Sequence, residues 1–91
     1  MVDLRTAYKR KDAIATTQMD GETVMMDVDQ GKYFGVSGSG SLLWDLLEEA
    51  QHVDELTARM CAAYDVEPNV ARADVEAFLA LLLDKQLIQE V

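Results

Sequence analysis

The chain has 91 residues, 49% of them hydrophobic, and a formal net charge of −9 at pH 7. This length gives one domain with a modest core and excludes a separate substrate domain, and the apolar fraction excludes a disordered chain. No apolar run is long enough to span a bilayer or to act as a signal peptide. The lone cysteine, Cys61, has no internal disulfide partner. We therefore expect a soluble cytoplasmic protein.

The charge is unevenly distributed. Four of the eight basic residues lie within residues 1–12, whereas fifteen of the seventeen acidic residues lie within residues 13–91. An acidic body repels phosphate backbones and favours cationic or neutral partners. The alternative is that the acidity only keeps a small domain soluble.

The first half of the chain predicts a small sheet. Residues 1–12 show no sustained periodicity, and we expect them to form a flexible N-terminal arm. Residues 13–19 predict a strand, and Asp20-Gly21 suits a type I′ hairpin turn. Residues 22–28 alternate as a second strand, and residues 32–36 follow a further turn as a third. Two tight turns give an antiparallel meander with the third strand at an edge.

The second half changes to helical periodicity. Ser37 is expected to cap a first helix carrying Leu42, Leu43 and Trp44, and a second helix is expected over residues 53–64. Pro68 suits the first position of a third helix that runs to about residue 85, and residues 87–91 form a tail or short strand. The predicted fold is α+β: a winged helix-turn-helix in which a three-stranded antiparallel sheet precedes three helices. Residues 13–91 would form a single domain.

The sequence gives little support for catalysis. His52 and Cys61 are nine residues apart along the second helix, about 13 Å, too far for a hydrogen-bonded catalytic pair. His52 suits a weak helix cap, and Cys61 is expected to face the core. Clustered Cys and His spacing and a phosphate-binding glycine loop are also missing, so we expect no enzyme, no metal and no cofactor.

A nucleic-acid partner is disfavoured by charge. In a winged helix-turn-helix the third helix would enter the major groove. Its exposed face carries Asp74, Glu76 and Asp84 against Arg72 and Lys85, and such a surface repels phosphates.

Peptide or protein binding remains, and the third helix gives a positive argument for it. Ala71, Val75 and Leu79 belong to an apolar stripe that docks the third helix, and Leu81 falls about 100° away from the neighbouring stripe residue Leu82. The flank of Leu81 contains Val70, Asp74, Ala77, Phe78 and Lys85. An unpaired edge strand beside this flank would accept a peptide by strand addition. The alternative is an ordinary half-exposed leucine beside a strand that is merely short.

One distributed motif adds to the peptide hypothesis. The run Met26-Asp27-Val28-Asp29-Gln30-Gly31-Lys32-Tyr33-Phe34-Gly35-Val36-Ser37 is followed by Trp44-Asp45-Leu46-Leu47 and later by Tyr64-Asp65-Val66, Asp74-Val75, Phe78-Leu79, Leu82 and Leu87-Ile88. Over residues 13–90 this resembles the PqqD-like family, the recognition elements for ribosomally made, modified peptides. The departures are Ser37 in place of an Asn cap, Gln86 where a Gly often ends the last helix, and His52 where a Ser or Thr cap is common.

The resemblance implies non-catalytic binding of a precursor's leader segment as a strand beside the third strand and against the third helix. It implies a stand-alone, lasso-peptide type of protein that presents the leader to a processing enzyme, either a cysteine protease of the lasso pathway or a radical-SAM enzyme. The residues carried over are Lys32, Tyr33, Phe34, Gly35 and Val36 on the strand, and Asp74, Ala77, Phe78, Leu81 and Lys85 on the helix. Val70 is added to the predicted site because it lies on the flank of Leu81. An acidic winged-helix regulator and a structural subunit of a larger enzyme remain the alternatives.

Overall fold

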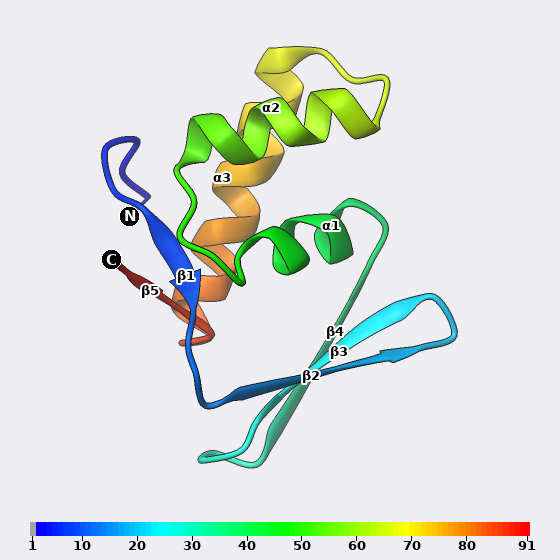
Figure 1. Ribbon diagram of the computed structural model, residues 1–91, viewed down its shortest axis with the longest axis vertical. Helices are drawn as coiled ribbons and strands as arrows, with labels where there is room; N and C mark the ends of the chain where they lie inside the picture. Colours follow the sequence, from blue (N-terminus) through cyan, green and yellow to red (C-terminus); the bar gives the residue numbers. More distant parts are fainter. Residues whose placement is uncertain (1) are drawn as a thin grey trace.

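The computed structural model describes residues 2–91 (Figure 1). The elements follow in the order β1 (Tyr8–Arg10), β2 (Ile14–Met19), β3 (Glu22–Asp27), β4 (Lys32–Ser37), α1 (Ser39–Leu46), α2 (Val53–Ala63), α3 (Pro68–Asp84) and β5 (Ile88–Glu90). The predicted α+β order, a three-stranded antiparallel sheet followed by three helices, is confirmed.

The main sheet has the strand order β2-β3-β4, and both pairs are antiparallel. Asp20 and Gly21, between β2 and β3, have φ angles of 51° and 82°. Positive φ at both central residues is what a type I′ turn requires, so this turn prediction is confirmed. The meander therefore leaves β2 and β4 as the two outer strands.

The register gives the sheet two different faces. Met25 pairs with Thr16 on β2 and with Phe34 on β4, and directly paired residues share a face. Met25 is fully buried, and the indole Nε1–H of Trp44 on α1 donates to Thr16 Oγ1 at 2.9 Å, so this inner face packs on the helices. The alternate residues, such as Val24 with its partners Thr17 and Gly35, form an outer face.

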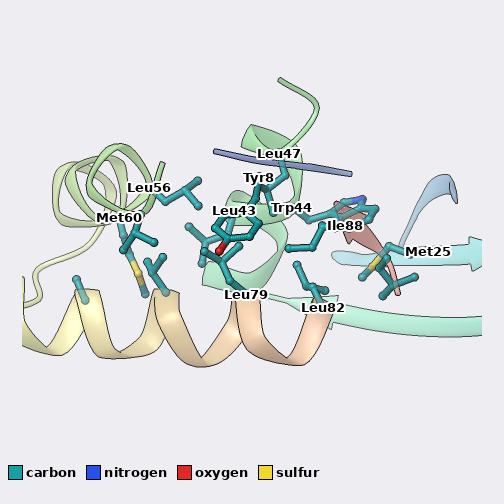
Figure 2. Packing of buried hydrophobic residues seen from close by; sticks show 14 residues of the cluster. Tyr8, Met25, Leu43, Trp44, Leu47, Leu56, Met60, Leu79, Leu82 and Ile88 are labelled. Carbon is teal, nitrogen blue, oxygen red and sulfur yellow. The ribbon is translucent and has the colours of Figure 1, made fainter. Parts of the chain in front are cut away.

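The hydrophobic core lies along α3. Figure 2 shows α3 running beneath the buried side chains, with Leu56 and Met60 of α2 toward one end and Met25 of the sheet toward the other. Leu79 and Leu82 on α3 and Trp44 on α1 are buried in the same cluster. The predicted stripe therefore docks α3, and the sheet meets the C-terminal part of this helix.

The N-terminal segment requires a correction to the predicted arm. Tyr8 to Arg10 form β1, which pairs antiparallel with β5, and Tyr8 is 0% exposed. The Tyr8 hydroxyl also accepts a hydrogen bond from the backbone N–H of Asp3 at 2.8 Å. The partner strand β5 lies at the opposite end of the chain, so the residues around β1 show no local sequence pattern that predicts a strand. Its three residues belong to the folded domain.

The start of α1 requires a second correction. Ser37 ends β4, and the N-cap is Gly38, with φ 57° and no side-chain capping bond. The backbone turns from strand to helix at a positive φ, which glycine adopts without strain. At α2, the N-cap is His52, as predicted.

Among the helices of residues 2–91, none combines the length and the apolar character needed to cross a bilayer.

Candidate peptide-binding groove

The outer edge of β4 has no strand beside it. Within residues 2–91, β4 pairs only with β3, from Lys32 with Asp27 to Ser37 with Glu22. The Ser41 hydroxyl donates to the Val36 carbonyl at 3.2 Å near the end of the strand. An edge strand presents backbone N–H and C=O groups that can hydrogen-bond to another extended chain.

An apolar groove lies along this edge. It has a volume of about 300 Å³ and is lined by Met25, Tyr33, Phe34, Gly35, Val36, Leu81, Leu82, Lys85 and Leu87. Leu81 of α3 is 49% exposed, and Tyr33 of β4 is 68% exposed. Leu82 and Leu87 are buried and form a floor that packing holds in place. The groove therefore offers an apolar seat beside unpaired backbone groups.

One end of the groove is polar and cationic. A second hollow of about 300 Å³ is lined by Gln30, Lys32, Phe34, Asp84, Lys85 and Gln86, so it shares Phe34 and Lys85 with the first. The Lys85 ammonium lies 6.0 Å from the centre of the Phe34 ring, at the limit for a cation–π contact. Neither Lys32 nor Lys85 forms an ion pair with any residue of 2–91. Two lysines against one aspartate make this end positive on an otherwise acidic chain.

The structure brings together most of the predicted site residues. Tyr33, Phe34, Gly35, Val36, Leu81 and Lys85 line the apolar groove, and Lys32 lines its polar end. Phe78 is half-buried against the core, close to Gly40 at the start of α1. Val70, Asp74 and Ala77 are exposed nearer the N-terminus of α3 and line neither hollow. Phe78 also lines neither hollow, and a binding role stays a prediction for all eleven residues.

Sequence reasoning did not assign the groove floor to the site. The sequence places Leu82 in the core stripe and Leu87 in the tail, yet both residues, together with Met25 of β3, line the groove. The alternation of β3 and the helical period of α3 identify residues that point inward. They do not indicate where two elements leave a gap.

The other outer strand, β2, offers no comparable seat. The hollow beside it is lined by Lys9, Arg10, Lys11, Asp12, Ile14, Thr16 and Glu48 and is mostly polar. Arg10 donates to Thr16 Oγ1 at 3.1 Å, stacks 5.2 Å from the centre of the Trp44 ring and pairs with Glu48. Because the hollow at the edge of β2 is mostly polar, whereas the groove between β4 and α3 is apolar, β4 is the better edge for strand addition.

The possible catalytic groups lie apart from the groove. His52 caps α2, where its backbone N–H donates to the Glu55 carboxylate at 2.8 Å and its Nδ1 lies 2.9 Å from the same oxygen. The backbone hydrogen bond first, and then the side chain of His52, holds the pKa of Glu55 below its usual value. Cys61 packs partly buried against the core. Over residues 2–91, no group of three or more His, Cys, Asp or Glu residues is arranged to hold a metal.

Both walls of the groove lie in a region that matches a known protein family. The family described as coenzyme PQQ synthesis protein D (PqqD) matches residues 22–88 of this chain. The chain belongs to the PqqD family. The matched range contains β3, β4 and all three helices, and therefore both walls of the groove. A comparison with curated proteins finds no significant match.

Solved structures of similar fold include two leader-peptide complexes. TbiB1 in complex with the TbiA(beta) leader peptide is 34% identical to this PqqD-family chain with a TM-score of 0.82, and the match covers 89% of this chain and 94% of that one. Lasso peptide synthetase B1 complexed with the leader peptide is 20% identical with a TM-score of 0.80, over 90% of this chain and 96% of that one.

A third similar structure is the solution NMR structure of the PqqD truncation of Methylobacterium extorquens PqqCD, which represents a functional and stand-alone recognition element for ribosomally synthesized and post-translationally modified peptides. It is 14% identical with a TM-score of 0.81, over 98% of this chain and 95% of that one. At identities of 14% and 20%, this structure and the synthetase B1 structure show the shared fold alone.

Proposed function

We propose that this chain binds the leader segment of a ribosomally made precursor peptide by adding it as a strand to the outer edge of β4. The observation that carries the proposal is an edge strand with one neighbour, lying beside an apolar groove built by α3 and β4. Membership of the PqqD family and the 34% identity to TbiB1, which was solved with a leader peptide, support the same function.

The energetics divide between backbone and side chains. Each intermolecular backbone hydrogen bond contributes only about 0.5–1.5 kcal/mol net, whereas association costs at least about 4 kcal/mol in lost freedom of motion. An added strand therefore requires apolar side chains to bind stably. Burying one Leu- or Phe-sized side chain contributes about 1.5–3 kcal/mol. Leu81 and Phe34 line a groove of a size to receive such a side chain.

In an added strand, neighbouring leader residues would contact different parts of the protein. In an added strand every second side chain points to the inner face, toward the groove, and the others point to the outer face. The end of the groove near Lys32 and Lys85 favours a neutral or acidic leader residue. Val70, Asp74 and Ala77 would contact a leader that continues along α3 beyond the end of β4.

The proposed role is binding and presentation without catalysis. His52 and Cys61 have structural surroundings, and neither lines the groove. The enzyme that receives the leader would be a protease or a radical-SAM enzyme acting on the same precursor. The cytoplasmic location expected from the lone cysteine stays a prediction.

A titration with the leader segment of the precursor encoded beside this chain tests the proposal. Amide chemical shifts of ¹⁵N-labelled protein are recorded up to saturating peptide. We expect shifts confined to residues 32–37 and to the flank of α3 from residue 70 to residue 85. A scrambled leader of the same composition is the control. No shift at saturating peptide, or shifts concentrated on β2, would contradict the proposal.

A further inference from the structure

Within residues 2–91, the outer face of the sheet carries no helix, because α1, α2 and α3 all lie on the inner side (Figure 1). A mostly apolar hollow of about 250 Å³ lies on this face and is lined by Ala15, Thr16, Thr17, Met19, Val24, Met26 and Tyr33. Met19 is 56% exposed. A contiguous apolar surface of this kind on a small domain is typical of an interaction site.

The outer face carries few charged residues, and those on it and in the turns at its ends are acidic. Among the strand residues that the register assigns to it, Glu22 is the only charged one. Asp20 and Asp29 lie exposed in the turns at its two ends. A complementary partner therefore has an apolar centre and a basic rim. A second copy of this chain would place acidic turns against acidic surface, which charge repulsion disfavours.

The outer face is continuous with the leader groove. Tyr33 lines both the outer hollow and the groove, and Gly35 is the adjacent outer-face residue on β4. A leader strand added to β4 would extend the same face, because its alternate side chains would emerge next to Tyr33 and Gly35. Anything docked there would contact the protein and the bound leader together.

We infer that the outer face, centred on Met19, Val24, Met26 and Tyr33, is the docking surface for the enzyme that processes the precursor, and that this enzyme presents an apolar patch with a basic rim. The inference rests on the proposed leader-binding function and names the surface by which the leader is presented.

The size of the face predicts cooperativity. Three strands of six residues cover about 20 Å by 15 Å, an area of about 300 Å², which is far below the roughly 800 Å² per partner that a stable complex buries. An added leader strand widens the face by about 5 Å and contributes its own side chains. The enzyme should therefore bind the leader complex at least about tenfold more tightly than it binds the free protein.

Methionine methyl groups can report on each surface separately. Met19 and Met26 lie on the outer face, Met25 lines the groove and Met60 lies in the core against α3. With ¹³C-methyl-methionine protein, addition of leader peptide should shift Met25. Addition of the processing enzyme encoded beside the precursor should then shift or broaden Met19 and Met26 and leave Met60 unchanged. Unchanged Met19 and Met26 signals while the enzyme processes the precursor would overturn the inference.

A charge variant tests the same surface by activity. Thr17→Lys with Met19→Lys places two cations on exposed positions of β2 within the apolar part of the outer face, where they would meet the apolar patch of the enzyme. Ala58→Lys with Ala63→Lys adds the same charge to exposed positions of α2. We expect the sheet variant to keep its leader affinity within twofold and to lose at least tenfold in its stimulation of precursor processing, while the α2 variant keeps both.

Three results would distinguish failure of the docking inference from failure of the leader-binding proposal. Full stimulation of processing by the sheet variant would overturn the docking surface while leaving leader binding intact. Failure of the unsubstituted protein to bind the leader would refute the proposed function itself. A dimer in sedimentation that the sheet variant converts to monomer would assign the face to a second copy and overturn the inference.

Discussion

Leu81 is the residue whose exposure distinguishes the groove from the core. It is 49% exposed on a helix whose neighbouring residue Leu82 is 1% exposed. An apolar side chain left half in water costs little to truncate in the free protein, but in a complex its lost contacts weaken binding. We therefore predict that Leu81→Ala weakens leader binding by about 1–2 kcal/mol, roughly 5- to 30-fold, and changes the free energy of unfolding by less than about 0.5 kcal/mol.

Leu4→Ala provides the matched control for this prediction, since Leu4 is also half-exposed, at 44%, and lies outside the groove. Its leader affinity, measured by titration calorimetry, should equal that of the unsubstituted protein. Equal affinities for all three proteins would contradict a contact between Leu81 and the leader.

Gln86 follows the C-cap residue Lys85 of α3 and has a backbone conformation that is strained for any residue with a Cβ atom. Its φ is 60°, in the left-handed region that favours glycine. The Gln30 amide Nε2–H donates to Gln86 Oε1 at 3.1 Å on the surface, a contact too exposed to offset the backbone cost fully. We predict that Gln86→Gly raises the free energy of unfolding by about 1 kcal/mol in urea denaturation. A less stable variant would mean that the Gln30 contact outweighs the strain.

Glu55 makes the start of α2 sensitive to acid. Its pKa in the folded protein lies below the usual 4.5 because His52 hydrogen-bonds to its carboxylate. A lowered pKa stabilises the folded state above pH 4.5, and this contribution disappears as the pH falls through the lowered value. Glu55→Ala should therefore be less stable than the unsubstituted protein at pH 7, and the difference should shrink by pH 3. Urea midpoints at the two pH values check this, and a difference independent of pH would contradict it.

At the scale of elements, β4 is the strand on which the proposal depends. In strand addition the main-chain groups of β4 hydrogen-bond to those of the leader. Chemical modification of the leader's backbone therefore tests this binding mode without any change to the protein. We predict that N-methylation of single leader residues weakens binding strongly at alternate positions and weakly between them, because only every second N–H faces β4. Fluorescence anisotropy of labelled analogues measures the series. Uniform effects along the leader would indicate docking through side chains alone.

Most elements follow from local pattern. The type I′ turn at Asp20-Gly21, the alternation of β3 and the Pro68 start of α3 each depend on neighbours within a few residues, and each is where the sequence places it. The edge position of β4 follows as well, because two tight turns order three strands without long-range information. The cap of α1 does not follow, since Ser37 and Gly38 compete and only the path from sheet to helix decides between them.

At the scale of the whole molecule, long-range contacts limit what the sequence predicts. β1 exists because β5 lies beside it, with Tyr8 opposite Glu90. The groove likewise exists because the C-terminal part of α3 meets the sheet at an angle that leaves Leu82 and Leu87 as its floor. Such features depend on the packing of elements that are distant in the sequence, so periodicity finds their residues but not their arrangement.

Substitution of Tyr8 tests whether the pairing of β1 with β5 stabilises the fold. It is fully buried in the core, and its hydroxyl accepts from Asp3. A flexible arm would tolerate its loss, whereas removal of a buried aromatic ring costs about 3–5 kcal/mol. We predict that Tyr8→Ala lowers the free energy of unfolding by that amount in urea denaturation. Arg5→Ala, at a nearby exposed position, should leave the free energy of unfolding unchanged. Equal stability of both variants would indicate that residues 1–12 form a flexible arm.

Amide hydrogen exchange with and without the leader peptide tests the central claim most directly. If the leader becomes the fourth strand of the sheet, backbone N–H groups at alternate positions of β4 gain protection on binding, while those of β2 keep their rates. Protection that appears on β2, or none on β4 at saturating leader, would contradict strand addition at this edge.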